Sequence, residues 1–468
     1  MAHYNRRRFL QLSAAGFLGG AGALAGLGRS QAFASTAGGY KALVGIMLKG
    51  GVDMFDAVLP RDPESFEAML ARRPGILNAH GGSRDPDNQI ALAPSNAARF
   101  GTRRFGLAPE LAGAGDMFAR GEAAIIGSVG PLLEPTTRQS MDSGTGALPP
   151  NLFSHNDQQS TWMALGPEGQ SRGWGGAMID AVLSAAPQTK PQFTTLTAGS
   201  GDVFLASRGT RAFRVPSDPS KLSVNMVRKQ WTTSGSHGQA ARDKLDAYLL
   251  RAQTGSANAF ARDVSRFQAE GLQTLRDYQD VYGTATPLST AFPDTRLGQQ
   301  LSAIANSIHI RGAIGNSRQI FYADRGGFDT HDGQAGDITG GLKDVFDAVA
   351  AFRLAMIETG AWDDVVVFTM SDFGRTLTEN GDGTDHGWGS HHFAFGGAVA
   401  GGAIYGDMPI LDPDMDHFTA RRARLIPSTS VEQYAATLGR WFGLDGAAID
   451  TALPNLSRFG SRDLGFLG

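Results

Sequence analysis

Residues 364–375 (DVVVFTMSDFGR) contain the strongest strand signal of the chain, an apolar run over 364–370 that polar residues follow at once. A short continuous run of this kind is typical of a parallel strand that is buried on both faces. Four further apolar runs occur at residues 42–48, 123–129, 193–197 and 319–322. We therefore predict five buried strands.

Helical patterns alternate with these strands. Apolar residues recur at helical spacing over residues 342–356, and Gly360 supplies a stop. Thr429 and Glu432 have the spacing of a capping box at the start of a later helix. The charged segment 238–283 also has helical character and would form a cap or an outer layer. Strands that alternate with helices predict a three-layer α/β fold, in which helices cover both faces of a mainly parallel sheet.

The first 34 residues have the three parts of an export signal. Arg6, Arg7 and Arg8 precede Phe9, an apolar Gly/Ala-rich stretch covers 12–27, and Ala32-Phe33-Ala34 offers a cleavage site. Paired arginines are what the twin-arginine translocase recognises, and the apolar stretch is shorter than the roughly 20 residues that span a membrane. We expect export to the periplasm or cell surface, no membrane span in the mature chain, and one α/β domain over residues 35–468.

The composition narrows the classes of partner and site. The chain has 42 basic and 45 acidic residues, and four arginines but no acidic residue lie in the first 34 positions, which leaves the rest near −7. This balance argues against nucleic acid as a partner. Cysteine is absent, so disulfides and thiolate metal sites are excluded. Any metal must be held by His, Asp, Glu or similar ligands.

Polar residues gather directly after the predicted strands, where ligands bind in parallel sheets. The segments are 50–53 (GGVD), 151–157 (NLFSHND), 326–332 (GGFDTHD), 371–375 (SDFGR) and 384–392 (TDHGWGSHH). Four of the ten histidines fall between residues 331 and 392. Imidazole with carboxylate suits zinc, manganese or iron, whereas carboxylate alone suits magnesium or calcium. Two such ions could clamp the oxygens of a phosphate or sulfate ester.

Structural interpretations of the same residues stay open. Asp53 would serve equally as a turn or helix-cap residue after two glycines. Asp372 and Arg375 would make a structural ion pair, and Ser154 with His155 is also ordinary loop chemistry.

These motifs resemble the bacterial family named domain of unknown function 1501, which is in turn similar to the alkaline phosphatase-like superfamily with its sulfatases. The resemblance implies a parallel sheet whose metal ligands lie on loops after the strands. It implies metal-binding roles for one set of residues: Asp53, Asp329, His331, Asp372, and His386 or His391. The pattern departs from the superfamily at Phe373, which replaces a histidine ligand, and at the nucleophile, for which Ser154 is the best placed residue.

The leader, the clustered His and Asp residues and the resemblance together lead to a first hypothesis, an exported metal-dependent hydrolase of phosphate or sulfate esters. Ser154 would attack beside His155, and Arg375 would steady an oxygen of the ester. The cofactor would be one or two divalent ions, zinc or manganese before magnesium or calcium, and the substrate a small-molecule ester or a polysaccharide. The alternative is a non-catalytic, metal-containing binding protein on the same fold. A third hypothesis is a metal-free structural protein of the cell surface.

Overall fold

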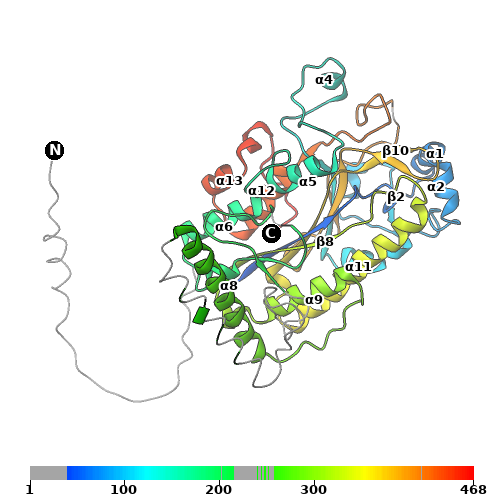
Figure 1. Cartoon of the computed structure of the whole chain (residues 1–468). Coiled ribbons are helices and arrows are strands. Elements are labelled where there is room, and N and C mark those ends of the chain that lie inside the picture. Colours follow the sequence, from blue (N-terminus) through cyan, green and yellow to red (C-terminus); the bar gives the residue numbers. More distant parts are fainter. Residues whose placement is uncertain are drawn as a thin grey trace, which may run out of the picture. The chain divides into compact units, whose positions relative to one another are not determined.

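The core of the fold is a nine-stranded sheet in which six of the eight neighbouring strand pairs are parallel. Figure 1 shows the sheet with helices on either side of it. The computed structural model describes residues 39–201, 203–215, 258–412 and 414–468, with isolated positions between 240 and 251. The predicted leader lies outside these residues. The order along the sheet is β13 (Ala403–Gly406), β5 (Ala123–Gly130), β12 (Ser390–Phe395), β9 (Val365–Ser371), β1 (Lys41–Leu48), β8 (Arg318–Arg325), β6 (Thr195–Thr197) and β7 (Phe213–Arg214), and β14 (Thr429–Ser430) also pairs with β5.

The five predicted strands are all present, and the prediction of a mainly parallel sheet is confirmed. The exception is β12, which runs antiparallel to both β5 and β9. At the centre, β1 pairs in parallel with β8 on one side and β9 on the other. The carboxyl ends of these three strands therefore lie side by side at one edge of the sheet.

Alternate residues of β1 enter two different apolar cores, because successive side chains of a strand point to opposite faces. Val44 and Ile46 belong to one core, and Leu43 and Met47 to the other. The first core takes residues from α3 (Ala112–Ala119), α8 (Ala259–Gly283), α9 (Arg296–His309) and α11 (Gln334–Glu358). The second takes residues from α5 (His155–Ala164), α6 (Trp174–Ala185), α12 (Val431–Phe442) and α13 (Gly446–Ala452). Helices thus cover both faces, as the three-layer prediction requires.

Two predicted helix boundaries differ from the observed ones. The helix expected over 342–356 is α11, which begins eight residues earlier and ends before Gly360. The capping box at the start of α12 is formed by Ser430 and Gln433, so the prediction of Thr429 and Glu432 was wrong by one residue. The reason is that Thr429 is held in β14 beside Val129, and the chain can enter the helix only after that pairing ends.

Smaller elements complete the fold. A three-stranded sheet combines β2 (Val58–Pro60), β4 (Phe105–Leu107) and β3 (Ile90–Ala91), and a hairpin combines β10 (Arg375–Glu379) with β11 (Thr384–His386). Short helices are α1 (Pro63–Arg72), α2 (Pro74–Ala79), α4 (Arg138–Asp142) and α10 (Arg311–Ile314).

In the expected helical segment 238–283, α8 packs on α9 through a hydrogen bond between the hydroxyls of Tyr278 and Ser307. Residues 238–257 are outside the description apart from isolated positions, and the segment's role as a cap stays a prediction. Among the described helices, none has the length and apolarity needed to cross a bilayer.

Candidate metal centre

Three segments that are distant in the sequence meet beyond the carboxyl ends of the central strands. Asp329 lies four residues after β8, Asp372 directly follows β9, and His155 is the first residue of α5. The hairpin of β10 and β11 adds His386, the last residue of β11. Loops after two parallel strands therefore supply two of these four residues, and a helix and a hairpin supply the other two.

The centre of the cluster is the carboxylate of Asp329. Its Oδ1 lies 3.1 Å from His331 Nε2 and 3.3 Å from His386 Nε2, and its Oδ2 lies 3.4 Å from His155 Nε2. The two Nε2 atoms of His331 and His386 are 2.9 Å apart. Ligand atoms around a tetrahedral zinc lie about 3.3 Å from one another, given metal–ligand bonds near 2 Å. The spacing of His155, Asp329 and His386, whose ligand atoms all lie within 4.8 Å of one another, suits a metal ion.

The hydrogen bonds behind two of the imidazoles leave their Nε2 atoms available for a metal. His155 Nδ1 is 2.7 Å from Asp372 Oδ2, and His386 Nδ1 is 2.8 Å from the carbonyl oxygen of Phe153. Each Nδ1 must carry the proton to donate to these oxygens, so each Nε2 keeps its lone pair. Within the described structure, His155 Nε2 is buried and has no hydrogen-bond partner. A buried nitrogen that has no hydrogen-bond partner and faces a carboxylate is suited to bind a metal ion.

The same contacts shift the acidity of the cluster. The hydrogen bond to Asp372 raises the pKa of His155, whereas burial lowers the pKa of His386. Burial alone would raise the pKa of Asp329, but the hydrogen bond and positive charge of Arg375 overcome it and hold that pKa below its usual range. Asp329 is therefore ionised at neutral pH and His386 neutral, the states in which each binds a metal.

Asp372 lies behind the cluster. Its Oδ2 accepts hydrogen bonds from His155, from Gln159 Nε2 at 2.9 Å and from the amide of Gly50 at 3.1 Å. This carboxylate orients His155 and stands one step away from the ligand atoms. Gln159 was not predicted from the sequence, although its position four residues after His155 on a helix places it on the same face.

Arg375 connects the loops that follow β1 and β8 with the strand β11 through hydrogen bonds. Its buried guanidinium donates to the carbonyl oxygens of Gly50, Gly51, Phe328 and Thr384 and to Asp329 Oδ1 at 2.5 Å. The ion pair anticipated with Asp372 is thus made with Asp329. Glycine is required at position 51 because its φ is 81° and a β-carbon there would overlap the ring of Phe373.

Phe373, at the position where the sequence resemblance predicts a histidine ligand, packs against the cluster. Its ring centre lies 4.8 Å from that of His155 and 4.6 Å from that of His386. It therefore gives the imidazoles an apolar wall.

Asp53 does not join the cluster. Its buried carboxylate accepts from Arg73 Nη1 and Gln334 Nε2, both at 2.8 Å, and from the amide of Phe55 at 3.0 Å. The interpretation as a turn residue describes these contacts better than that of a metal ligand.

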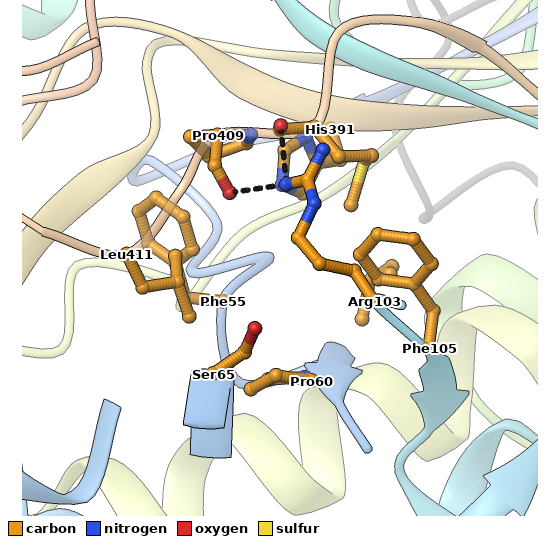
Figure 2. Close-up of a pocket in the computed structure, with 10 residues that line it drawn as sticks. Phe55, Pro60, Ser65, Arg103, Phe105, His391, Pro409 and Leu411 are labelled. Atoms are coloured by element: carbon orange, nitrogen blue, oxygen red, sulfur yellow. Dashed lines mark hydrogen bonds between the residues drawn. The ribbon is translucent and has the colours of Figure 1, made fainter. Parts of the chain in front are cut away.

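His391 also lies outside the cluster around Asp329. It lines a small pocket of about 20 Å³ with Phe55 and Arg103, and Figure 2 shows Arg103 reaching over this pocket toward Pro409. Its Nδ1 accepts from the amide of Ser128 at 3.1 Å, and burial lowers its pKa to about 4. Of the two residues expected to supply the last histidine, it is His386 that reaches the cluster.

Ser154, the expected nucleophile, precedes His155 at the N-cap of α5, and its hydroxyl donates to Asp157 Oδ2 at 2.8 Å. The turn before it is strained, because Asn151 and Phe153 have positive φ of 53° and 74°. This turn aims the Phe153 carbonyl at His386, a role that a sequence pattern does not reveal.

Comparisons with known proteins give a family and distant structural likenesses. Three solved structures are similar over much of this chain. "Crystal structure of Ps i-CgsB in complex with k-i-k-neocarrahexaose" has 10% identity and a TM-score of 0.32, covering 91% of this chain and 75% of that one. The PsFucS1 sulfatase from Pseudoalteromonas sp. has 9% identity and a TM-score of 0.31, covering 92% and 70%. The lipoteichoic acid synthase LtaP from Listeria monocytogenes has 8% identity and a TM-score of 0.29, covering 83% and 74%.

Likenesses this loose carry no inference about the chemistry of the cluster. No functionally curated protein matches the sequence significantly. The model of the family described as "Protein of unknown function (DUF1501)" matches residues 40–453, which include every residue of the cluster. The chain is therefore a member of the DUF1501 family.

Proposed function

We propose that this protein is an exported, metal-dependent hydrolase of phosphate or sulfate esters, with a divalent ion held by His155, Asp329 and His386. The observation that carries the proposal is that one ligand atom from each of these three residues lies within 4.8 Å of the others. They come from three separate segments of the chain, so local sequence does not account for their meeting. Export rests on the twin-arginine leader at residues 1–34.

The ligand set favours zinc or manganese over magnesium or calcium, because two of its three members are imidazoles. It supports one ion better than two, because Asp53 and His391 are engaged with other partners. Three protein ligands leave a fourth position open, which is the arrangement of catalytic zinc sites. When bound, such an ion would polarise an ester oxygen and lower the pKa of a water molecule.

The chain's own residues supply orientation and proton transfer. Asp372 and the Phe153 carbonyl fix the imidazoles of His155 and His386. His331 Nε2 lies 2.9 Å from the lone pair of His386 Nε2 and donates its proton there, so Nδ1 of this 44% exposed side chain is the atom that would take the proton of an attacking water. The water oxygen would form a bond to phosphorus or sulfur, the ester bond would break, and the alcohol would leave with a proton. Water is a better supported nucleophile than Ser154, whose hydroxyl already donates to Asp157.

The contacts of His331 also favour a second candidate, a non-catalytic binding protein with a structural metal. Its Nε2 lies at ligand spacing from both Asp329 and His386. If His331 binds the ion, four protein ligands close the site, as in structural zinc centres. Polysaccharide or protein recognition would then be the function.

Metal analysis of protein purified from the periplasm tests both candidates. We expect about one equivalent of zinc or manganese in the wild type and none in Asp329→Ala or His386→Ala. His391→Ala is the matched control, because it removes a buried histidine of the same segment that lies outside the cluster, and it should keep the metal. A metal-free, folded wild type would refute the hydrolase.

The His331→Ala variant separates the candidates. Turnover of 4-nitrophenyl phosphate or sulfate that is lost while the metal stays supports the open, catalytic site. Loss of the metal in this variant supports the closed, structural one.

A further inference from the structure

A buried polar relay adjoins the metal centre without contributing a ligand to it. It runs from Arg73 through Asp53 to Gln334, and all three side chains are fully buried. Arg73 Nη1 and Gln334 Nε2 both donate to Asp53 Oδ2, each at 2.8 Å. Buried polar groups on this scale are retained only when each member is satisfied, and a satisfied network fixes the geometry around it.

The other end of the Gln334 amide ties two ligand-bearing segments together. Its Oε1 accepts hydrogen bonds from the hydroxyls of Thr330 at 3.1 Å and Thr384 at 2.7 Å. Thr330 is buried between Asp329 and His331, which are both exposed. Thr384 begins β11, the three-residue strand that ends at His386. One oxygen atom is therefore the shared acceptor of the two segments whose side chains meet over the metal position.

Arg73 holds the partner strand of the same hairpin. Its Nε donates to the carbonyl of Leu377 at 3.1 Å and its Nη2 to that of Thr376 at 2.8 Å. Both carbonyls belong to β10, which pairs with β11. The relay thus forms hydrogen bonds to both strands of the hairpin, and the ion pair between Asp53 and Arg73 holds it in place.

Gln334 itself is fixed from below by a long helix. It is the first residue of α11, a 25-residue helix packed on the sheet, and its backbone N–H donates to the carbonyl of Asp382 at 3.0 Å. The orientation of its side chain is determined as well, because the NH₂ group faces a carboxylate and the oxygen faces two hydroxyl donors. The side chain is a rigid spacer between the helix, the Asp329 segment and the hairpin.

We infer that Gln334 is a positioning residue of the metal centre, which sets the separation of Asp329 and His331 from His386. This inference rests on the proposed metal site. Without the side-chain amide, Thr330 and Thr384 lose their common acceptor, while the backbone hydrogen bond from Thr384 to Thr330 and the contacts of Arg375 remain between the hairpin and the Asp329 segment. The ligand spacing near 3 Å would then be less tightly fixed.

Cobalt(II) titration of the full chain measures this role directly, since the d–d absorption of cobalt reports ligand geometry and the titration gives its Kd. Gln334→Met keeps the length of the side chain and removes its hydrogen bonds. Loss of a partner that orients metal ligands typically weakens binding about 10- to 100-fold, and we expect that range with a changed absorption spectrum. Thr384→Val, which removes one hydroxyl only, should weaken binding several-fold and covers the case in which Gln334→Met does not fold.

Gln300→Met is the matched control. Gln300 is a buried glutamine on α9 whose amide bridges the backbone and side chain of Asp324, so its loss should lower stability to a similar degree. We expect this control to keep the wild-type Kd and spectrum. Equal Kd values for wild type, Gln334→Met and Thr384→Val, or an equal weakening in Gln300→Met, would overturn the positioning role while the metal site stands. A wild type that binds no cobalt would refute the metal site and the inference with it.

Discussion

Glu432 is a buried carboxylate whose ionisation should lower the stability of the fold. We therefore expect Glu432→Gln to stabilise the protein above neutral pH. The side chain is 3% exposed in the first turn of α12, and Asn455 Nδ2 contacts its carboxylate at a long 3.4 Å. Burial raises its pKa from 4.5 to about 7. The unfolded chain therefore loses this proton near pH 4.5, while the folded chain keeps it until about pH 7, so stability falls across that window. At 1.36 kcal/mol per pKa unit, the loss reaches about 3 kcal/mol above pH 7.

Glutamine has no proton to lose, so the variant should escape this penalty. At pH 5 the variant should be more stable by less than about 1 kcal/mol, because the penalty has only begun to develop there, and at pH 8 by about 3 kcal/mol. For about 430 residues, with an unfolding entropy of about 2.1 cal/mol/K per residue, this corresponds to about 3–4 °C in Tm. Thermal and urea unfolding between pH 5 and pH 8 measure the difference.

The matched control is Glu64→Gln, an exposed glutamate at the same second position of helix α1. It has the same relation to the helix dipole but no burial, so its effect should stay within about 0.5 kcal/mol at both pH values. A gain in Glu432→Gln that is the same at pH 5 and pH 8, or no gain at pH 8, would refute the assignment of the cost to a buried ionised carboxylate.

Three further predictions concern the site and its support. Asp53→Ala should cost about 3–5 kcal/mol in urea unfolding, because it leaves the buried Arg73 without its carboxylate; a loss below about 1 kcal/mol would show that the pair is dispensable. Arg375→Lys should lose about 3 kcal/mol in the same assay, since an ammonium cannot reach all five acceptors of the guanidinium, and wild-type stability would contradict this. Metal affinity should fall as pH drops below the raised pKa of His155, by up to about tenfold per pH unit, because a proton on that imidazole competes with the ion; a Kd for cobalt that is constant from pH 8 to pH 5 would exclude His155 as a ligand.

The strands were predictable because their signal is local. Continuous apolar runs such as residues 365–370 can be satisfied only by burial on both faces, and each run became a strand of the central sheet. Boundaries that depend on tertiary pairing were not predictable. Thr429 has a side chain that could cap a helix, but its backbone pairs with β5 as part of β14. The observed capping box therefore begins at Ser430.

The site was predictable as a location and less so as a set of roles. Position after a strand correctly brought Asp329, His331 and Asp372 to one edge, since strand ends are fixed by the same local signal. Which carboxylate faces the cluster depends on partners that are distant in sequence. Asp53 binds Arg73, and His391 on β12 accepts a hydrogen bond from Ser128. No sequence pattern indicates either contact.

The contacts of Phe373 and His155 are best understood together. The resemblance read from the sequence predicts a histidine after Asp372 and predicts Asp372 itself as a ligand. In the structure the phenyl ring of Phe373 packs against both His155 and His386, and Asp372 accepts the Nδ1 proton of His155 and fixes its ring. The imidazole that α5 supplies is thus held by the Asp372 carboxylate, with its Nε2 toward Asp329. The three side chains of His155, Asp329 and His386 bring ligand atoms within 4.8 Å of one another, and Asp372 supports this arrangement without joining it.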